Sequence, residues 1–251
     1  NEKSIMDGTL WCLNLMVFMK NQIKYSLLII LLLITPLFSI CQNNFNDIGE
    51  REGLWSGYHE NGKIKYTGRF VDGKESGSFN YFDYAGNKVI HLNYTEPGSV
   101  CEAVLFYTNG LVQSRGQYRN KIKEKLWVYY NQQQEKVLEE NYERGLLEGE
   151  CIYYQKGRVS EIYTFSNGEK NGLSKMYYQS GNLNMSSNYL NNMLHGQVLV
   201  YFNDNNLNLE SEGFYFRGLK DSIWIFYNDL GKMINVEKYE KGQLLDVDVR
   251  E

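Results

Sequence analysis

The strongest constraint on this chain is a pattern that returns about every 24 residues. Each copy contains two adjacent aromatic residues, as in Tyr129-Tyr130, and the second members of successive pairs lie 23 to 25 residues apart. Seven such pairs, together with Tyr58 after Trp55, give eight copies between residues 53 and 242. A repeat of this length is typical of solenoids, in which each unit packs only against its neighbours. The sequence therefore predicts an extended array.

Each copy has the pattern of a β-hairpin. In the first copy, Asn61-Gly62 separates two short alternating runs, a strong hairpin signal in which both turn residues adopt a positive φ. No stretch after residue 42 has a helical period. The predicted fold class is therefore all-β: an elongated antiparallel β-hairpin solenoid of about eight repeats of 24 residues. A second aromatic column supports this register: Phe70, Tyr94, Tyr118, Tyr142, Phe165, Tyr189, Tyr215 and Tyr239.

Glycine marks the turn between one copy and the next. In five of the eight copies a glycine stands three residues after the second aromatic column. The junction Arg119–Lys125 has no glycine, and Lys121 stands where the turn glycine is expected. Lysine adopts the left-handed conformation less readily than glycine or asparagine. We therefore expect this junction to be the least regular joint of the array.

Strand parity predicts that the two members of each aromatic pair point to opposite faces of the sheet. Cross-strand aromatic pairs contribute roughly 0.2–1 kcal/mol each, so the array is stabilised by their sum. On one face we expect a stack of Trp55, Phe79, Tyr81, Trp127, Tyr129, Trp224 and Phe226.

The opposite face is the candidate binding surface, because exposed aromatic rows mark binding sites and tyrosine is a frequent interface anchor. The alternative, that both rows only stabilise the sheet, stays open. The candidate binding residues are Tyr58, Phe82, Tyr130, Tyr154, Tyr178, Phe202 and Tyr227.

The chain begins with two segments that carry no repeat. We interpret residues 1–18 as an upstream extension, with the start of translation at Met19. Residues 19–41 have the features of a secretory signal, namely early lysines, the apolar run Leu27–Ile34 and a small-x-small site ending at Cys41. The repeat domain is then predicted to span residues 42–251 and to be exported to the periplasm, the outer membrane or the exterior.

Two alternatives for this segment remain open. One is an uncleaved N-terminal membrane anchor, although Tyr25–Ile40 is shorter than the ~20 apolar residues of a spanning helix. The other is a lipoprotein signal with Cys41 as the modified residue, although Ile40 stands where that signal has a small residue.

The sequence contains no recognisable catalytic or metal-binding pattern. Its three histidines lack metal-ligand spacing, and its four cysteines form no Cys-x-x-Cys motif. Cys101 and Cys151 lie two repeats apart, too far for a disulfide between them. We therefore predict no catalytic residue, no metal and no cofactor. The net charge of −4 gives no reason to expect a nucleic acid as partner.

The consensus unit reads Gly-x-Trp/Phe-x-Tyr-Tyr, a turn, then Tyr-x-x-Gly-Lys-x-x-x-Gly, with its best copies at Gly53–Gly77 and Tyr142–Gly196. Over Gly53–Gly242 it resembles the MORN repeat, and it is most similar to a bacterial multi-copy variant, some members of which are named antitoxins. The resemblance implies stacked hairpins that bind proteins or, in eukaryotic relatives, membranes.

On that basis we expect a non-enzymatic scaffold for protein–protein interaction, antitoxin-like in one version of the hypothesis, with another protein as its partner. The alternative is a cell-envelope module that binds a glycan or a lipid surface through the tyrosine-lined face.

Overall fold

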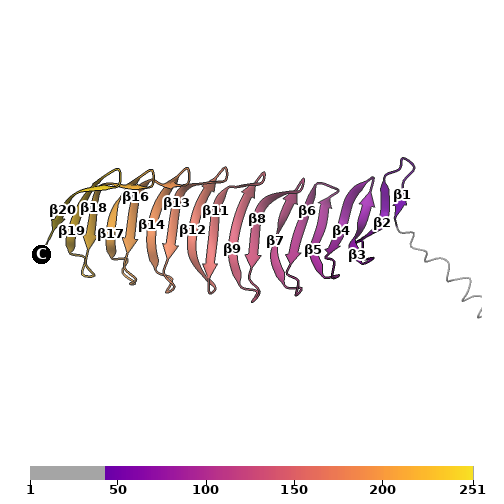
Figure 1. The fold of residues 1–251 in the computed structure, drawn as a ribbon, viewed down its shortest axis with the longest axis horizontal. Helices are drawn as coiled ribbons and strands as arrows, with labels where there is room; N and C mark the ends of the chain where they lie inside the picture. Colours follow the sequence, from indigo (N-terminus) through magenta and orange to yellow (C-terminus); the bar gives the residue numbers. More distant parts are fainter. Residues whose placement is uncertain (1–42, 251) are drawn as a thin grey trace, which may run out of the picture. The chain divides into compact units, whose positions relative to one another are not determined.

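In the computed structural model, residues 43–250 form one antiparallel sheet in which consecutive strands lie side by side (Figure 1). Every regular element in this range is a strand, which confirms the predicted all-β hairpin solenoid. Residues 1–42 and 251 lie outside the described part of the chain. The predicted upstream extension, signal segment and lipoprotein cysteine fall there.

Twenty strands make up the sheet, and most have seven to nine residues. The short strand β10 pairs with the end of β9, and β11 then pairs with the rest of β9. In the same way, β15 and then β16 pair with β14. The strands are β1 (Asn44–Phe45), β2 (Arg51–Tyr58), β3 (Ile64–Val71), β4 (Lys74–Phe82), β5 (Lys88–Glu96), β6 (Val100–Phe106), β7 (Val112–Arg119), β8 (Ile122–Tyr130), β9 (Lys136–Glu143), β10 (Leu146–Leu147), β11 (Gly149–Gln155), β12 (Arg158–Ser166), β13 (Glu169–Tyr177), β14 (Leu183–Leu190), β15 (Met193–Leu194), β16 (Gly196–Tyr201), β17 (Leu209–Phe216), β18 (Leu219–Tyr227), β19 (Met233–Glu240) and β20 (Gln243–Val249).

Tight two-residue turns connect most hairpins to the next, whereas three residues, Pro97 to Ser99, join β5 to β6. Asp72 and Gly73 both have a positive φ, 47° and 73°, which matches the twist of the flanking strands. Asn120 and Lys121 adopt the same conformation at 52° and 65°, and Arg119 pairs with Ile122 across the turn. The prediction of an irregular joint here was wrong. Asparagine tolerates the left-handed region at the first turn position, and Lys121 is exposed.

The turns at the other edge are longer than the sequence indicated. In the first unit the N–H of Gly62 donates to the carbonyl of His59 at 2.9 Å, and the N–H of His59 donates to the carbonyl of Lys63 at 2.8 Å. Gly62 has a φ of 80°, whereas Asn61 is not in the left-handed region. The prediction that both residues of Asn61-Gly62 take a positive φ was therefore wrong, because the turn spans five residues.

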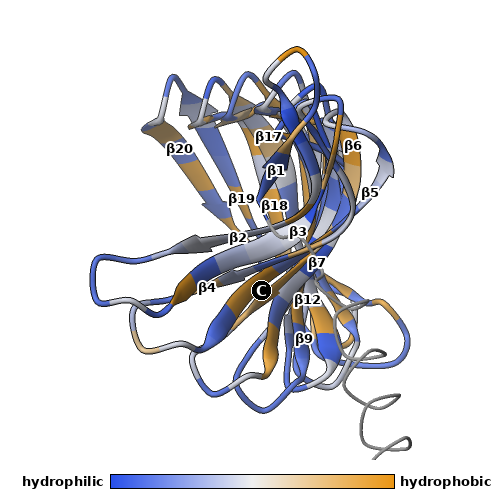
Figure 2. Cartoon of the chain, turned by 90° about the vertical axis from the view of Figure 1, so that its right-hand side faces the viewer, coloured by the Kyte–Doolittle hydropathy of each residue, from blue (hydrophilic) through white to orange (hydrophobic). Residues whose placement is uncertain are grey.

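Regular β-bulges bend the strands. In eight strands the register shifts just before an aromatic residue at or next to the end of the strand, as between Tyr129 and Tyr130. Bulges bend a strand and increase its twist. Seen end-on, the strands of residues 43–250 curl into an open trough (Figure 2).

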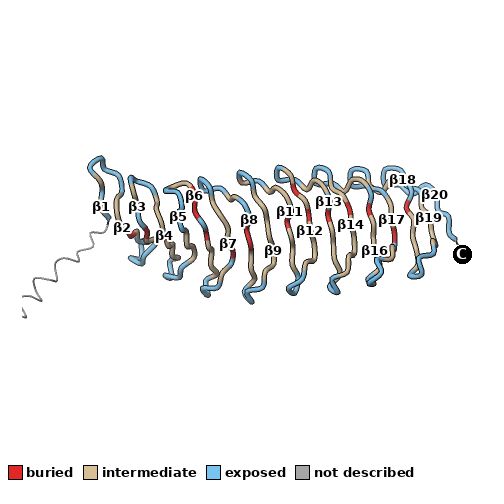
Figure 3. The backbone as a smooth tube through the Cα atoms, turned by 180° about the vertical axis from the view of Figure 1, so that it is seen from behind, coloured by how far each residue is buried: buried red, intermediate tan, exposed pale blue. Residues whose placement is uncertain are grey.

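A row of residues that are neighbours on successive strands, here called the spine, runs along this sheet and contains most of its fully buried side chains. Trp127 is 0% exposed and Phe79 1% exposed, and the buried stretches lie within the strands (Figure 3). Because a flat single sheet leaves both faces open to water, such burial places the spine on the concave side, here called the inner face. The spine residues are Trp55, Gly68, Phe79, Leu92, Ala103, Gly116, Trp127, Glu140, Cys151, Tyr163, Ser174, Ser187, Val198, Gly213 and Trp224.

Several bulky rings of the spine lie against a small residue of the preceding strand. The ring of Trp127 lies over Gly116, where an added Cβ would be 2.3 Å from a ring carbon. Tyr163 fits between Cys151 and Ser174 in the same way. The predicted residues do lie on this face, but their rings contact the second aromatic column and small residues of an adjacent strand.

Candidate functional site

Metal-ligand clusters and reactive thiols are the first features to consider among the described residues. Among residues 43–250 no group of three or more His, Cys, Asp or Glu side chains could hold a metal ion. Cys101 and Cys151 are free thiols, and burial raises the pKa of both, which makes them weak nucleophiles. No helix with the length and hydropathy of a membrane span occurs within the described part of the chain.

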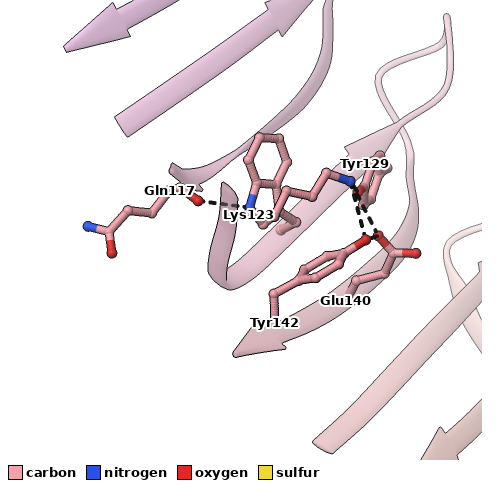
Figure 4. A network of polar contacts seen from close by, with 6 residues as sticks. Gln117, Lys123, Tyr129, Glu140 and Tyr142 are labelled. Atoms are coloured by element: carbon pink, nitrogen blue, oxygen red, sulfur yellow. Dashed lines mark hydrogen bonds and ion pairs between the residues drawn. The ribbon is translucent and has the colours of Figure 1, made fainter. Parts of the chain in front are cut away.

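Lysine over aromatic rings is the most distinctive polar feature of the inner face. The Nζ atom of Lys123 lies 4.9 Å from the ring centroid of Trp127, 5.1 Å from that of Tyr129 and 4.8 Å from that of Tyr142. Lys123 also donates hydrogen bonds to both tyrosine hydroxyls (Figure 4). Here a cation is held by an aromatic cage, an arrangement worth roughly 0.5–2 kcal/mol.

A carboxylate completes the cage. The hydroxyl of Tyr142 donates to Oε2 of Glu140 at 2.7 Å, and this oxygen lies 3.9 Å from Nζ of Lys123. Burial, and next the Glu140 carboxylate, raise the pKa of Tyr129 and Tyr142. The indole N–H of Trp127 donates to the main-chain carbonyl of Gln117 at 3.1 Å, which fixes the ring that forms the cage floor (Figure 4).

The same position carries a cation in three further units, in each case directly over rings of the inner face. The shortest distances from the cationic atom to a ring centroid are 5.0 Å for Arg51 over Trp55, 3.3 Å for Lys170 over Tyr163 and 4.2 Å for Lys220 over Trp224.

The second unit differs, and it contains a pocket of about 330 Å³. Glu75 stands 48 residues before Lys123, at the same repeat position, and so carries a carboxylate where four other units carry a cation. The next unit offers only Ser99 at this position and Ala103 in the spine, so no bulky side chain fills the space. The pocket is lined by Glu75, Tyr81, Leu92, Tyr94, Gly98, Ser99, Cys101, Tyr118 and Lys121.

The opposite, outer face carries most of the candidate binding residues. Tyr58, which is 58% exposed, Phe82, Tyr130, Tyr154 and Tyr227 each follow a bulge at or next to the end of a strand. Apart from Tyr58 these side chains are half-buried.

The tyrosines of this row have long polar partners on their own face. The guanidinium of Arg115 lies 5.6 Å from the ring centroid of Tyr130, and the hydroxyl of Tyr154 donates to Glu139 at 2.9 Å. The hydroxyl of Tyr227 donates to Glu212 at 2.7 Å. The outer row therefore presents tyrosines framed by charges.

Tyr178 and Phe202 do not share this position. Each follows the strand-ending residue, Tyr177 or Tyr201, and begins the turn. Their assignment to the same row was wrong because the unit of Tyr154 has a two-residue turn in place of a five-residue one, which shifts the next two pairs by one. The longer turn between Tyr201 and Leu209 restores the spacing for Tyr227. The Tyr178 hydroxyl donates to the carbonyl of Tyr201 at 2.9 Å, so it joins neighbouring turns. The binding role of the seven residues stays a prediction.

A comparison with family models gives one match. The model described as MORN repeat variant matches residues 51–72 and 170–191. Each matched segment covers one hairpin, β2 with β3 and β13 with β14, and each begins at a cation of the inner face, Arg51 or Lys170. No curated protein matches the chain.

Proposed function

Since this chain is a MORN-repeat protein of the variant type, we propose that it is a non-enzymatic scaffold that binds another protein along its sheet. The observation that carries the proposal is the outer row of half-buried tyrosines and polar partners on a one-layer sheet. Tyrosine combines a large apolar area with a polar end and is enriched at binding hot spots. An antitoxin-like role is the special case in which the bound protein is a toxin that binding inactivates.

The double substitution Tyr130→Ala/Tyr154→Ala tests this surface. We expect the full chain to capture a stoichiometric protein from envelope extract, and we expect the double variant to bind that purified protein at least tenfold more weakly, because two anchor rings are lost. Binding is measured by calorimetry. The thermal unfolding midpoint shows whether the variant stays folded.

Gln132→Ala/Gln133→Ala is the matched control, since both side chains are exposed at the neighbouring turn. Equal loss of binding in the control and the tyrosine variant would contradict the proposal. Retention of the wild-type chain on glycan arrays or lipid vesicles, without any protein partner, would favour a glycan- or lipid-binding module instead.

We also propose that the repeat domain is exported by the segment of residues 19–41, which has a basic start, an apolar run and a small-x-small end. In a bacterial host, N-terminal sequencing of the mature protein is expected to read from Gln42. A lipid-modified Cys41 would identify the lipoprotein alternative. A cytoplasmic product that begins at Met19 would contradict export.

A further inference from the structure

The aromatic cage around Glu75 has the same components as the cages that hold the chain's own cations. Phe79, Tyr81 and Tyr94 stand 48 residues before Trp127, Tyr129 and Tyr142. The centroids of Phe79 and Tyr81 are 6.3 Å apart at 28°, compared with 6.4 Å and 35° for Trp127 and Tyr129. The rings of the second unit are thus placed as in a filled cage.

The charge at this cage is reversed. After burial, the Glu75 carboxylate is the next cause that raises the pKa of Tyr81 and Tyr94, so it lies close enough to act on both hydroxyls. Within residues 43–250 Glu75 forms no ion pair. Lys121 lines the same pocket, but its side chain is exposed. The pocket therefore combines a carboxylate without an ion-pair partner and an aromatic cage without an internal cation.

These features together define a ligand class. Aromatic faces attract cations, and a carboxylate at the same cage adds a direct charge partner while it disfavours anions. Three of the four cations that fill the other cages are lysines. An alkylammonium group on a flexible stem is thus the occupant that this type of cage takes within the chain itself.

We propose that the pocket of Glu75, Tyr81 and Tyr94 binds a lysine side chain of the partner protein. The partner's lysine takes over the position that Lys123, Lys170 and Lys220 hold in their own cages. This inference rests on the proposed protein-binding function, and it adds a charge-specific contact on the inner face.

The test uses the full chain and two small probes, N-α-acetyl-lysine methylamide and its neutral counterpart N-α-acetyl-norleucine methylamide. We expect the lysine probe to shift the NMR signals of Tyr81 and Tyr94 in a saturable way, while the norleucine probe leaves them unchanged. Glu75→Lys gives the second unit the same residue as Lys123 and is expected to weaken probe binding at least tenfold, because the chain then fills its own cage.

Glu102→Lys is the matched control, since it makes the same charge change at an exposed site on the opposite face. It is expected to bind the lysine probe within about twofold of the wild type. Equal probe binding by Glu75→Lys and Glu102→Lys would overturn the site, and so would equal binding of the two probes by the wild-type chain. Thermal unfolding midpoints establish that both variants are folded.

The two proposals fail in different ways. If the chain captures no protein but the lysine probe still requires Glu75, the scaffold function is wrong and the cation site stands. If a partner is captured and Glu75→Lys binds it as tightly as the wild type does, the lysine site is wrong and the scaffold function stands.

Discussion

Replacing Gly116 with serine is expected to lower the free energy of unfolding by about 3 kcal/mol. A Cβ at this position would lie 2.3 Å from the ring of Trp127, and that ring is fully buried and held by its hydrogen bond to Gln117. Gly116 is not in the left-handed region, so the cost is steric and does not come from the backbone.

A compensating substitution makes this prediction specific. Trp127→Val alone is expected to cost about 3 kcal/mol, because it leaves a cavity over Gly116. The double variant Gly116→Ser/Trp127→Val recreates the pair that Ser187 and Val198 form at the same repeat positions, both buried. Its loss should fall short of the sum of the single losses by at least about 1 kcal/mol. Urea unfolding measures all four proteins, and additive losses would refute the size complementarity of the spine.

Raising the pH above the ordinary tyrosine pKa of 10 is expected to unfold the repeat domain within about one further pH unit. Burial is the largest cause that raises the pKa of eight inner-face tyrosines, so the folded state keeps them protonated when the unfolded state has lost the proton. The stability they contribute is fully present below pH 10 and is lost as the pH rises toward the folded pKa. The tyrosines are Tyr81, Tyr94, Tyr118, Tyr129, Tyr142, Tyr153, Tyr163 and Tyr189.

The expected size follows from proton linkage. Each tyrosine that stays protonated only in the folded state costs about 1.4 kcal/mol per pH unit, and eight together cost on the order of 5–10 kcal/mol once partial exposure is allowed for. This equals the whole stability of a typical domain. Tyrosinate absorbance should therefore appear together with the loss of strand circular dichroism.

Tyr163→Phe provides the control for the alkaline transition. Tyr163 is 6% exposed, and the substitution removes one titrating hydroxyl while it keeps the ring of the spine. Its free energy of unfolding should fall less steeply with pH, by about 1.4 kcal/mol per unit. Tyrosine ionisation that proceeds while the strands stay intact would show that the inner face is open to water, contrary to this prediction.

The sequence was sufficient for the fold class and for the sorting of most rings between faces, although Tyr178 and Phe202 were placed in the wrong row. Strand side chains alternate with a period of two, so a repeat spacing fixes both the hairpins and the face on which Trp127 and Tyr130 lie. The turns were less accessible. The predictions of a two-residue turn at Asn61-Gly62 and of an irregular turn at Lys121 were both wrong. The geometry of a turn depends on how the two strands pair across the hairpin, which single residue types do not determine.

Part of the candidate site could have been predicted from the spacing of charged residues relative to the rings of the spine. Lys123 and Lys220 each stand four residues before a tryptophan of the spine, and Glu75 stands four residues before Phe79. Comparison of this position between copies reveals the reversed charge. The pocket itself could not be predicted, since it depends on how residues of three neighbouring units, among them Tyr81, Ser99 and Tyr118, come together in the folded sheet.

The pairing of a bulky spine residue with a small one in the preceding strand limits how such a gene can gain or lose copies. Loss of residues 69–116 would leave Gly68 beneath Trp127, where Gly116 had been, and the join would pack as before. Loss of residues 93–116 alone would place Leu92 beneath that ring. We therefore expect tolerated duplications and deletions to be those that bring together spine residues of matching side-chain volume at the new junction. Copy number and core packing would then evolve together.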